Sequence, residues 1–294
     1  MPLPQLPPRE PESHKGDFGR ALLIGGSRGM TGAIALAGLS ALRGGAGLVQ
    51  LAIAETSLDV VASFEPSYMT APLAADDQGR IAEQALGALE QLAGRATAVG
   101  CGPGLGRSPG LTRLVAWLYE HLPLPVVFDA DALNALAEQP DILVRHAGPR
   151  ILTPHPGEFQ RLTGGKKLLL RQQSELAATE LAAHSQIVVV LKGHRTFITD
   201  GKQQAHNETG NPGMATGGTG DVLTGLIAAL VCQKLSPFDA ARLGVHLHGL
   251  AGDLAAEDLG QVSLIASDLV RYLPAAFQQH AAGSSATRMS GFGR

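Results

Sequence analysis

The sequence of 294 residues has only two cysteines, no block of basic residues and no long apolar run. Cys101 and Cys232 are too few for a disulfide framework or a metal-binding pattern, and we expect both to be small buried hydrophobic residues. A net charge of −3 without a basic cluster argues against a nucleic-acid partner. The longest uncharged apolar run, residues 29–42, is shorter than the roughly 20 residues of a membrane span, and no signal peptide is visible. We therefore expect a cytoplasmic protein that does not bind membranes.

Several common site signatures are also missing. No Gly-Lys-Ser/Thr occurs, which excludes a P-loop, and His246 and His248 are too loosely placed for a metal site. Gly102-Pro-Gly-Leu-Gly106 follows a predicted strand but has Arg107 where the dinucleotide fingerprint has its third glycine, so it is either a tight turn or a ligand contact. Gly25-x-Ser27-x-Gly29 matches the nucleophile elbow of hydrolases, but no earlier strand could supply an oxyanion loop. A loop that exposes its backbone to a polar substrate is favoured.

What the sequence does contain is an alternation of short apolar strands and helices. Strands are predicted at residues 20–24, 48–53, 96–100, 125–129, 150–153 and 187–191, and helices at 31–43, 81–92, 111–120, 131–138, around 158–162, at 168–185 and from about 221, 238 and 267. Asp200-Gly201 predicts a hairpin between residues 196–199 and 203–206. This order predicts an α/β fold with three α/β/α layers around a mostly parallel sheet. We expect one domain at 14–279, a poorly ordered segment at 1–13 and a flexible tail at 280–294.

The most informative stretch is Asn211-Pro-Gly-Met-Ala-Thr-Gly-Gly-Thr-Gly-Asp221, which runs into an apolar segment of helix formers. A glycine loop that opens a helix is an anion site in outline, because unpaired backbone N–H groups and the helix dipole attract a phosphate. Asp221 would repel that phosphate, so its position needs a reason. Asp221 is either the N-cap of the helix or a general base that takes a proton from a hydroxyl attacking phosphorus.

Three further motifs follow predicted strands. Asp129 and Asp131 could hold Mg²⁺ through water, although we favour a helix cap for at least one of them, Asp131 being the candidate. His155 stands between two prolines, and this stiff loop favours contact with a substrate over a purely structural turn. Lys192-Gly-His-Arg-Thr196 could meet a nucleotide phosphate or base, or be only a solvated hairpin end.

Taken together, these motifs resemble the ADP- or ATP-dependent NAD(P)H-hydrate dehydratases, a family with a ribokinase-like fold. The resemblance spans about residues 14–275, and its last motif is highly specific. The matching motifs occur in the family's order at residues 14–20, 25–47, 102–106, 129–134, 153–158, 192–193 and 211–221.

The resemblance implies repair of a damaged cofactor. The (S)-hydrates of NADH and NADPH (NADHX and NADPHX) would be dehydrated to NAD(P)H, and ADP would be consumed to AMP and phosphate, with ADP or ATP as co-substrate and Mg²⁺ as cofactor. It implies Asp221 as the catalytic base, with Ala33, Gly104, His155 and Asp221 at the hydrate. At the nucleotide it implies Lys192, Gly193, His194, Arg195, Thr196, Gly217, Gly218 and Gly220, and it assigns no residue to a metal.

The resemblance also bears on partners and on rival functions. Tetrameric relatives suggest a homotetramer, and many relatives carry a fused epimerase domain for which this chain has no room, so we expect any NAD(P)H-hydrate epimerase to be a separate protein. A ribokinase-like kinase of a vitamin alcohol, of the hydroxyethylthiazole or pyrimidine type, would use the same Asp221 and the same anion site. A nucleotide-sensing module would need no base at Asp221.

Overall fold

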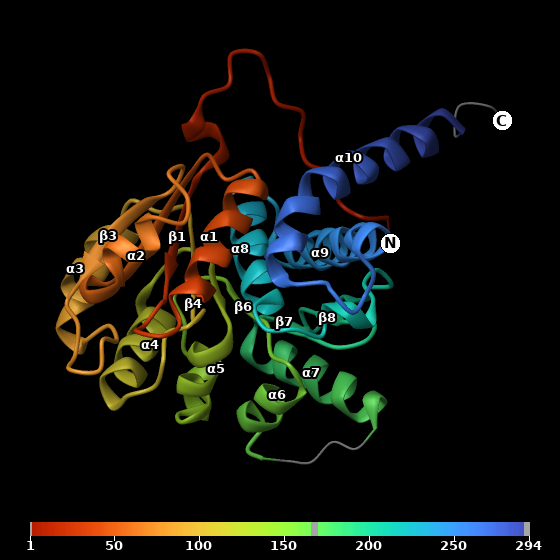
Figure 1. Ribbon diagram of the computed structural model, residues 1–294. Coiled ribbons are helices and arrows are strands. Elements are labelled where there is room, and N and C mark those ends of the chain that lie inside the picture. The colour runs from red at the N-terminus through yellow and green to blue at the C-terminus, as the bar shows by residue number, and fades with distance from the viewer. Residues whose placement is uncertain (1, 166–169, 291–294) are drawn as a thin grey trace.

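The computed structural model describes residues 2–165 and 170–290, with the backbone alone after residue 283. Figure 1 shows a central sheet between two layers of helices, which confirms the three-layer α/β/α arrangement predicted from the sequence. Within the described residues, no helix is both long and apolar enough to span a membrane.

The described residues form one sheet of nine strands: β1 (Arg20–Ile24), β2 (Leu48–Ala54), β3 (Met69–Leu73), β4 (Ala98–Cys101), β5 (Val126–Phe128), β6 (Arg150–Leu152), β7 (Val188–Leu191), β8 (Phe197–Thr199) and β9 (Gln204–His206). Their spatial order is β3-β2-β1-β4-β5-β6-β7-β8-β9. Neighbours from β3 to β7 are parallel, whereas β8 is antiparallel to both β7 and β9, as the predicted hairpin requires. Because parallel strands end at the same edge, the loops that follow them come together there.

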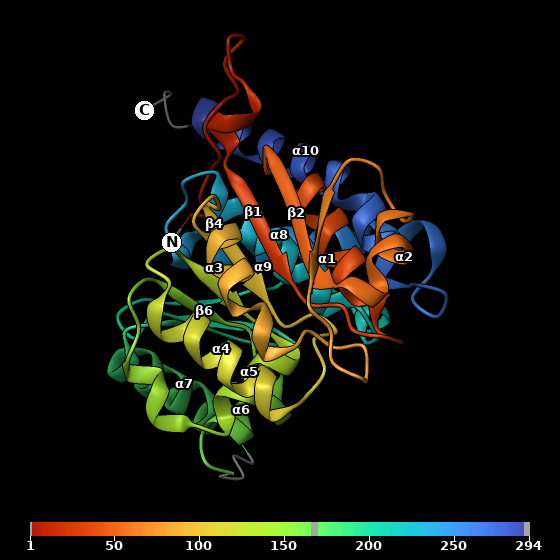
Figure 2. The same ribbon diagram turned by 90° about the vertical axis from the view of Figure 1, so that its left-hand side faces the viewer.

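Helices cover both faces of the sheet (Figure 1, Figure 2). One layer contains α1 (Thr31–Arg43), α8 (Thr219–Cys232), α9 (Pro237–Leu259) and α10 (Ala266–Ser290), and the other contains α3 (Leu86–Ala93), α4 (Pro109–His121), α5 (Ala130–Ala137), α6 (Pro156–Leu162) and α7 (Arg171–Ser185). Within β1, Ala21 and Leu23 join the core under the first layer, while Leu22 and Ile24 join the core under the second. Both faces of each strand are buried, which is why the strands read as continuous apolar runs.

The sequence analysis missed the edge of the sheet next to β2. Residues 55–75 contain α2 (Leu58–Ala62) and the edge strand β3, which were left unassigned. In β3 exposed and buried residues mix, and Pro72 removes a backbone donor, so the segment lacks the apolar run that marked the central strands. An edge strand pairs on one side only and can tolerate that proline.

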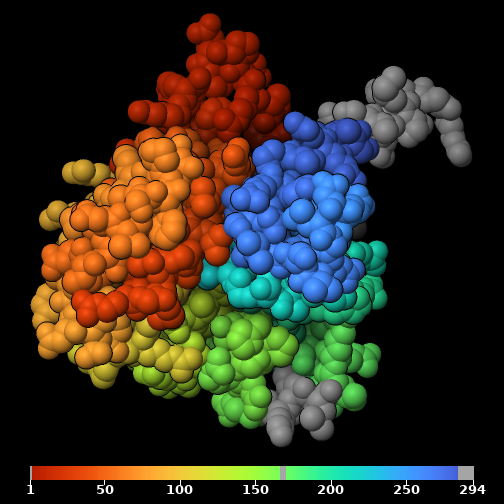
Figure 3. All heavy atoms as spheres, in the orientation of Figure 1, coloured from red at the N-terminus to blue at the C-terminus, as the bar shows by residue number. Residues whose placement is uncertain are grey.

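The two ends of the chain differ from the expectation of loose segments. α10 continues without a break to Ser290, well past residue 279, and residues 291–294 of the expected tail lie outside the described residues. Alanines such as Ala281 and Ala282, which helped suggest a loose tail, are also the strongest helix formers. Residues 2–13 are irregular (red in Figure 3), and at their start Arg242 of α9 donates to the Pro2 carbonyl at 3.0 Å.

A buried arginine joins β6 to the end of α4. Arg150 is only 1% exposed and has no carboxylate partner within the described residues, yet its guanidinium donates to four backbone carbonyls. These bonds, of 2.5–3.1 Å, go to the carbonyls of Tyr119, Leu122, Leu124 and Pro149. Burial lowers the pKa of Arg150 to about 10, so the side chain remains charged at neutral pH. Arg150 therefore satisfies the carbonyls that α4 leaves unpaired at its end.

Replacing this arginine tests its structural role. Arg150→Met keeps much of the side-chain volume but leaves the buried carbonyls without a donor, so we expect the free energy of unfolding to fall by about 3 kcal/mol. Urea denaturation monitored by circular dichroism measures this change. Arg145→Met is the matched control, because Arg145 is exposed and pairs only with Glu120 at 2.8 Å, and about 0.5 kcal/mol or less is expected. Equal stability losses in the two variants would contradict the capping role.

Candidate active site

The glycine stretch leads into α8, as predicted from the sequence. Gly218 is the N-cap and has a φ of 93°, a left-handed conformation that suits glycine and turns the chain into the helix. The first bond within the helix runs from Val222 N to Gly218 O at 3.1 Å. The amides of Thr219, Gly220 and Asp221 therefore have no acceptor inside the helix. With the helix dipole behind them, these amides form a site for a phosphate.

Asn211 and Asp253 hold the loop that precedes α8. Asn211 Nδ2 donates to Asp253 Oδ1 at 3.0 Å and to the Gly252 carbonyl at 2.9 Å. Asp253 Oδ2 accepts from Gly210 N at 2.8 Å, and Asn211 Oδ1 accepts from Gly213 N at 3.0 Å. α9 thus anchors the loop at several points. Sequence reasoning assigned no role to Asp253, because no spacing in the sequence relates it to Asn211.

Asp221 is the third residue of α8, so the N-cap interpretation of its position is wrong. Its partly buried carboxylate takes part in none of the ion pairs or side-chain hydrogen bonds of the described residues. Burial, followed by the negative charge of Asp129, raises the pKa of Asp221 to about 7, while Lys192 opposes the rise. A carboxylate that exchanges a proton near neutral pH suits a general base. The base interpretation stays a prediction that this geometry supports.

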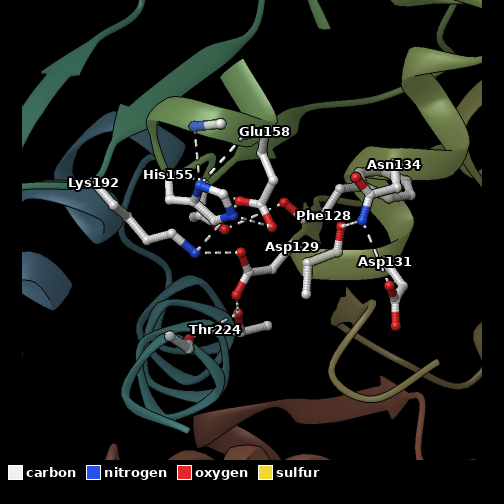
Figure 4. Close-up of polar contacts among 12 residues, drawn as sticks. Phe128, Asp129, Asp131, Asn134, His155, Glu158, Lys192 and Thr224 are labelled. Atoms are coloured by element: carbon white, nitrogen blue, oxygen red, sulfur yellow. Dashed lines mark hydrogen bonds and ion pairs between the residues drawn. The ribbon is translucent and has the colours of Figure 1, made fainter. Parts of the chain in front are cut away.

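Asp129 connects three elements beside Asp221. Figure 4 shows its carboxylate between Lys192, at the end of β7, and Thr224 of α8. Asp129 Oδ1 accepts from Lys192 Nζ at 2.6 Å, and Oδ2 accepts from Thr224 Oγ1 at 2.7 Å. Burial lowers the pKa of Lys192, but the nearby carboxylates of Asp129 and Glu158 outweigh burial and leave it raised. Lys192 is therefore a buried, charged ammonium and not a solvated hairpin end.

The structure corrects the expectations for the 129–131 carboxylates. Asp129 stands at the N-cap of α5 but makes no side-chain cap bond, because both its oxygens are engaged elsewhere. Asp131 lies inside the first turn, so it is not the cap; it accepts from Gly106 N at 2.9 Å and lies 3.6 Å from Arg107 Nε. Over residues 2–165 and 170–290, no group of three or more His, Cys, Asp or Glu residues could hold a metal.

His155 has the structural role that was left open beside substrate contact. Its Nδ1 accepts from Gly157 N at 3.0 Å and from Glu158 N at 3.4 Å, while Glu158 Oε2 accepts from His155 N at 2.8 Å. This capping box begins α6. Burial and then the charge of Lys192 lower the pKa of His155, so the ring is neutral at pH 7. The other side of the ring is half exposed, and contact with a substrate stays a prediction.

A cavity of about 750 Å³ opens over the first turn of α8. It is lined by the 192–196 loop, by residues 207–212 and by α9, and it brings together most of the predicted nucleotide residues with His155 and Asp221. Those residues are Lys192, Gly193, His194, Arg195, Thr196, Gly218 and Gly220. Gly217, Ala33 and Gly104 do not line it. The predicted nucleotide side is thus a single concave site that also contains His155 and Asp221 of the predicted hydrate side, whereas Ala33 and Gly104 lie outside it.

Comparison with known proteins places the chain in a family. A family profile described as NAD(P)H-hydrate dehydratase matches residues 21–275. The chain belongs to the NAD(P)H-hydrate dehydratase family. It is 45% identical over 271 residues to the bifunctional NAD(P)H-hydrate repair enzyme Nnr of Moorella thermoacetica, covering 92% of this chain and 51% of the relative. The chain therefore spans about half the length of the curated relatives that it matches.

Solved structures agree over nearly the whole chain. An ADP/ATP-dependent NAD(P)H-hydrate dehydratase of Bacillus subtilis, crystallised with ATP and Mg²⁺, is 34% identical with a TM-score of 0.79, over 94% of each chain. A ribokinase-like superfamily protein of Enterococcus faecalis is 28% identical with a TM-score of 0.80, over 94% of this chain and 92% of that one. The ribokinase-like fold expected for the dehydratase family is thereby confirmed.

Two of the residues that family resemblance assigns to the hydrate, Ala33 and Gly104, lie together at the start of α1. Gly104 has a φ of 59°, and a Cβ there would come within 2.5 Å of the Met30 carbonyl and 3.0 Å of Ala33 Cβ, so only glycine fits against this turn. The next turn of α1 packs against the start of α8. A Cβ added to Gly218, the N-cap of α8, would lie 2.7 Å from Leu36 Cδ1. Ala33 and Gly104 therefore lie together, on the side of the 211–221 loop that faces α1.

His248 is a residue of this site that sequence reasoning missed. It lines the cavity from α9, and its Nε2 lies 2.8 Å from the Thr219 carbonyl. Burial lowers the pKa of His248 to about 4, so the ring is neutral and donates this bond. In the sequence, His248 was considered only together with His246, as a candidate metal motif. The helical position of residue 248 on the core-facing side of α9 was the one available signal.

Gly220→Val tests the phosphate site of this dehydratase-family chain. A Cβ at residue 220 would lie 3.3 Å from Lys192 Nζ and 3.6 Å from Asp129 Oδ2, so a branched side chain would extend into the space over the free amides. We expect a folded protein whose affinity for ADP, measured by calorimetry, falls about tenfold or more. Gly87→Val is the control, because Gly87 is likewise the second residue of its helix and has nothing within 4 Å of a Cβ. Unchanged ADP affinity in Gly220→Val would place the phosphate elsewhere.

Proposed function

We propose that this chain is an ADP- or ATP-dependent NAD(P)H-hydrate dehydratase. It converts (S)-NAD(P)H-hydrate to NAD(P)H and, with ADP, releases AMP and phosphate. The observation that carries the proposal is the position of Asp221, a carboxylate without an ion-pair partner whose pKa is about 7, at the third residue of the helix whose free amides face the cavity. A base and an anion site side by side suit phosphoryl transfer to a hydroxyl.

In the first step, Asp221 takes the proton of the ring hydroxyl of the hydrate. The hydroxyl oxygen attacks the terminal phosphoryl group, a P–O bond to the nucleotide breaks, and AMP leaves when ADP is the donor. The amides of residues 219–221 hold the charge that develops on the phosphoryl oxygens. Lys192, held beside Gly220 by Asp129, adds a positive charge at the same place.

The second step removes the phosphorylated oxygen from the ring. Hydroxide is a poor leaving group, whereas phosphate is a good one. The lone pair of the ring nitrogen expels phosphate, and loss of a proton from the neighbouring ring carbon restores the dihydropyridine. We propose that Ala33, Gly104 and His155 hold the hydrated ring near Asp221 during both steps. His155 is neutral and half exposed, and its Nδ1 already accepts backbone N–H groups, so its Nε2–H can donate a hydrogen bond there.

Mg²⁺ fits this site when the nucleotide is bound. The ion keeps several waters and binds through one or two carboxylates together with phosphates. The oxygens of Asp129 and Asp131 are engaged by protein groups, so they do not form a cage of their own. We propose that the ion enters on the nucleotide phosphates, which the α8 amides hold, and that it supplies positive charge to the phosphoryl oxygens.

The remaining expectations stay predictions. A vitamin-alcohol kinase would use the same base and anion site, but the match to a dehydratase family and the 102–106 and 153–158 motifs favour the dehydratase. A sensing module would not require Asp221. We further propose a cytoplasmic location, a homotetramer and cooperation with a separate NAD(P)H-hydrate epimerase.

Removing the base is the direct test of the mechanism. Asp221→Asn keeps the shape of the side chain but cannot accept a proton, so we expect kcat to fall about a hundredfold or more while ADP binding survives. In the wild type, activity should rise with pH through about 7, because only the deprotonated carboxylate acts as a base. Asp239→Asn, at the third residue of α9, is the control. Near wild-type turnover of Asp221→Asn would remove Asp221 from the chemistry.

The products distinguish a dehydratase from a kinase. Hydrated NADH, ADP and Mg²⁺ should yield NADH, AMP and free phosphate in equal amounts, because the ring nitrogen expels the phosphate that a kinase would leave in a stable ester. Absorbance of the reduced nicotinamide and phosphate release, followed in the same sample, measure both products. A phosphorylated organic product with no NADH recovered, from the hydrate or from a panel of vitamin alcohols, would leave the kinase interpretation instead.

A further inference from the structure

Lys192 and Asp221, both partly buried, lie close together in this site, and no ion pair joins them within the described residues. Lys192 Nζ lies 2.6 Å from Asp129 Oδ1 and 4.0 Å from Glu158 Oε2, and it acts electrostatically on Asp221 without forming an ion pair with it. An ammonium that could reach Asp221 would stabilise its charged form, so some other interaction must draw the ammonium away.

The geometry identifies that interaction as the carboxylate of Asp129. Its side chain is 1% exposed and is held from two sides, by Lys192 at one oxygen and by Thr224 at the other. Thr224 is one turn after Gly220 on α8, so the carboxylate is fixed to the helix that carries the base. A Cβ on Gly220 would lie 3.3 Å from Lys192 Nζ, which shows how close the ammonium comes to the first turn.

We propose that Asp129 is a positioning residue that holds Lys192 beside the first turn of α8 and away from Asp221. The ammonium is thereby available to the phosphoryl group, and the base is left free to take the proton. Without Asp129, the ammonium of Lys192 would lose its nearest partner and would be free to approach Asp221, with Glu158 at 4.0 Å as the competing partner. The inference rests on the proposed function for its catalytic meaning, but the positions of the charges do not depend on it.

Other charged and titratable groups around Asp221 do not replace Asp129 in this role. Asp131 is engaged by Gly106 N, and Glu158 is engaged by His155 N and lies farther from the ammonium. The groups that face the base come from the end of β5 and α5, from α6, from the end of β7 and from α9: Asp129, Asp131, His155, Glu158, Lys192 and His248. His155 and His248 are neutral at pH 7, since burial lowers the pKa of each.

The charge on Asp221 can be measured directly, without substrate. The full chain labelled with ¹³C at the aspartate carboxyls is titrated by NMR, and Asp221 is assigned from the spectrum of Asp221→Asn. In Asp129→Asn, a negative neighbour is lost and Lys192 is freed to pair with the base; both changes favour the charged form, so the pKa of Asp221 should fall by about one unit or more. Asp129→Ser should do the same and serves if the first variant does not fold.

Two further variants separate positioning from simple loss of charge. Thr224→Val removes the other hydrogen bond of Asp129 but keeps its charge and its ion pair, so the pKa of Asp221 should stay at its wild-type value. In a Lys192→Met background, Asp129→Asn should shift that pKa much less, because no ammonium remains to be released. An unchanged pKa in both Asp129 variants, or an equal shift with and without Lys192, would overturn the proposal.

The pH dependence of kcat/KM, measured with the hydrate as substrate, is an independent test. Asp129→Asn should move the acid limb of the kcat/KM profile to lower pH and reduce the plateau about tenfold or more, whereas a merely structural residue would lower the plateau without moving the limb. If the wild type fails to restore NADH from the hydrate, the dehydratase proposal fails. The NMR titration still decides whether Asp129 holds Lys192 away from the base.

Discussion

Burial of several carboxylates around one ammonium is the constraint on which this edge of the molecule depends. Ions removed from water lose hydration that only well-placed partners can replace. Asp129 obtains those partners from Lys192 and Thr224, and Asp131 from a backbone amide, whereas Asp221 obtains none and shows a raised pKa. The same surroundings thus give some carboxylates fixed partners and leave Asp221 without one, so that burial raises its pKa.

The parallel sheet makes this arrangement possible. β5, β6 and β7 are adjacent, so the residues that follow them, 129, 155 and 192, come to the same edge although they are far apart in the sequence. Both faces of these strands are buried, and a slip in register would move polar groups into the core. α8 packs across β1, β4 and β5 through residues such as Leu223 and Ile227. The base is therefore positioned by the rigid layers of the fold, while the loops supply the ligand contacts.

The fold was largely predictable, because the strands of a parallel sheet buried on both faces are continuous apolar runs that glycine loops separate. The edge strand β3 was not predicted for the opposite reason. It pairs on one side only, and its sequence has no continuous apolar run. In the site, the glycine loop before Asp221 was visible as an anion site. The links of Asp129 to Thr224 and of Asn211 to Asp253 were not, because each joins residues more than 40 positions apart with no pattern to connect them. Asp131 was expected as a cap from its place after a strand, but Asp129, two residues earlier, occupies the N-cap position.

The two halves of the site face different chemical demands, and the structure keeps them on different elements. Transfer of a phosphoryl group needs free amides, a cation and a base, and these come from α8 and the end of β7. Under the proposed function, the acceptor is recognised by Ala33 at the start of α1 and by the loops after β4 and β6, which carry Gly104 and His155. A change of acceptor could therefore arise in those loops without disturbing the charged cluster. That separation gives a physical reason why dehydratases and kinases can share the base and the anion site, and why the acceptor side must decide between them.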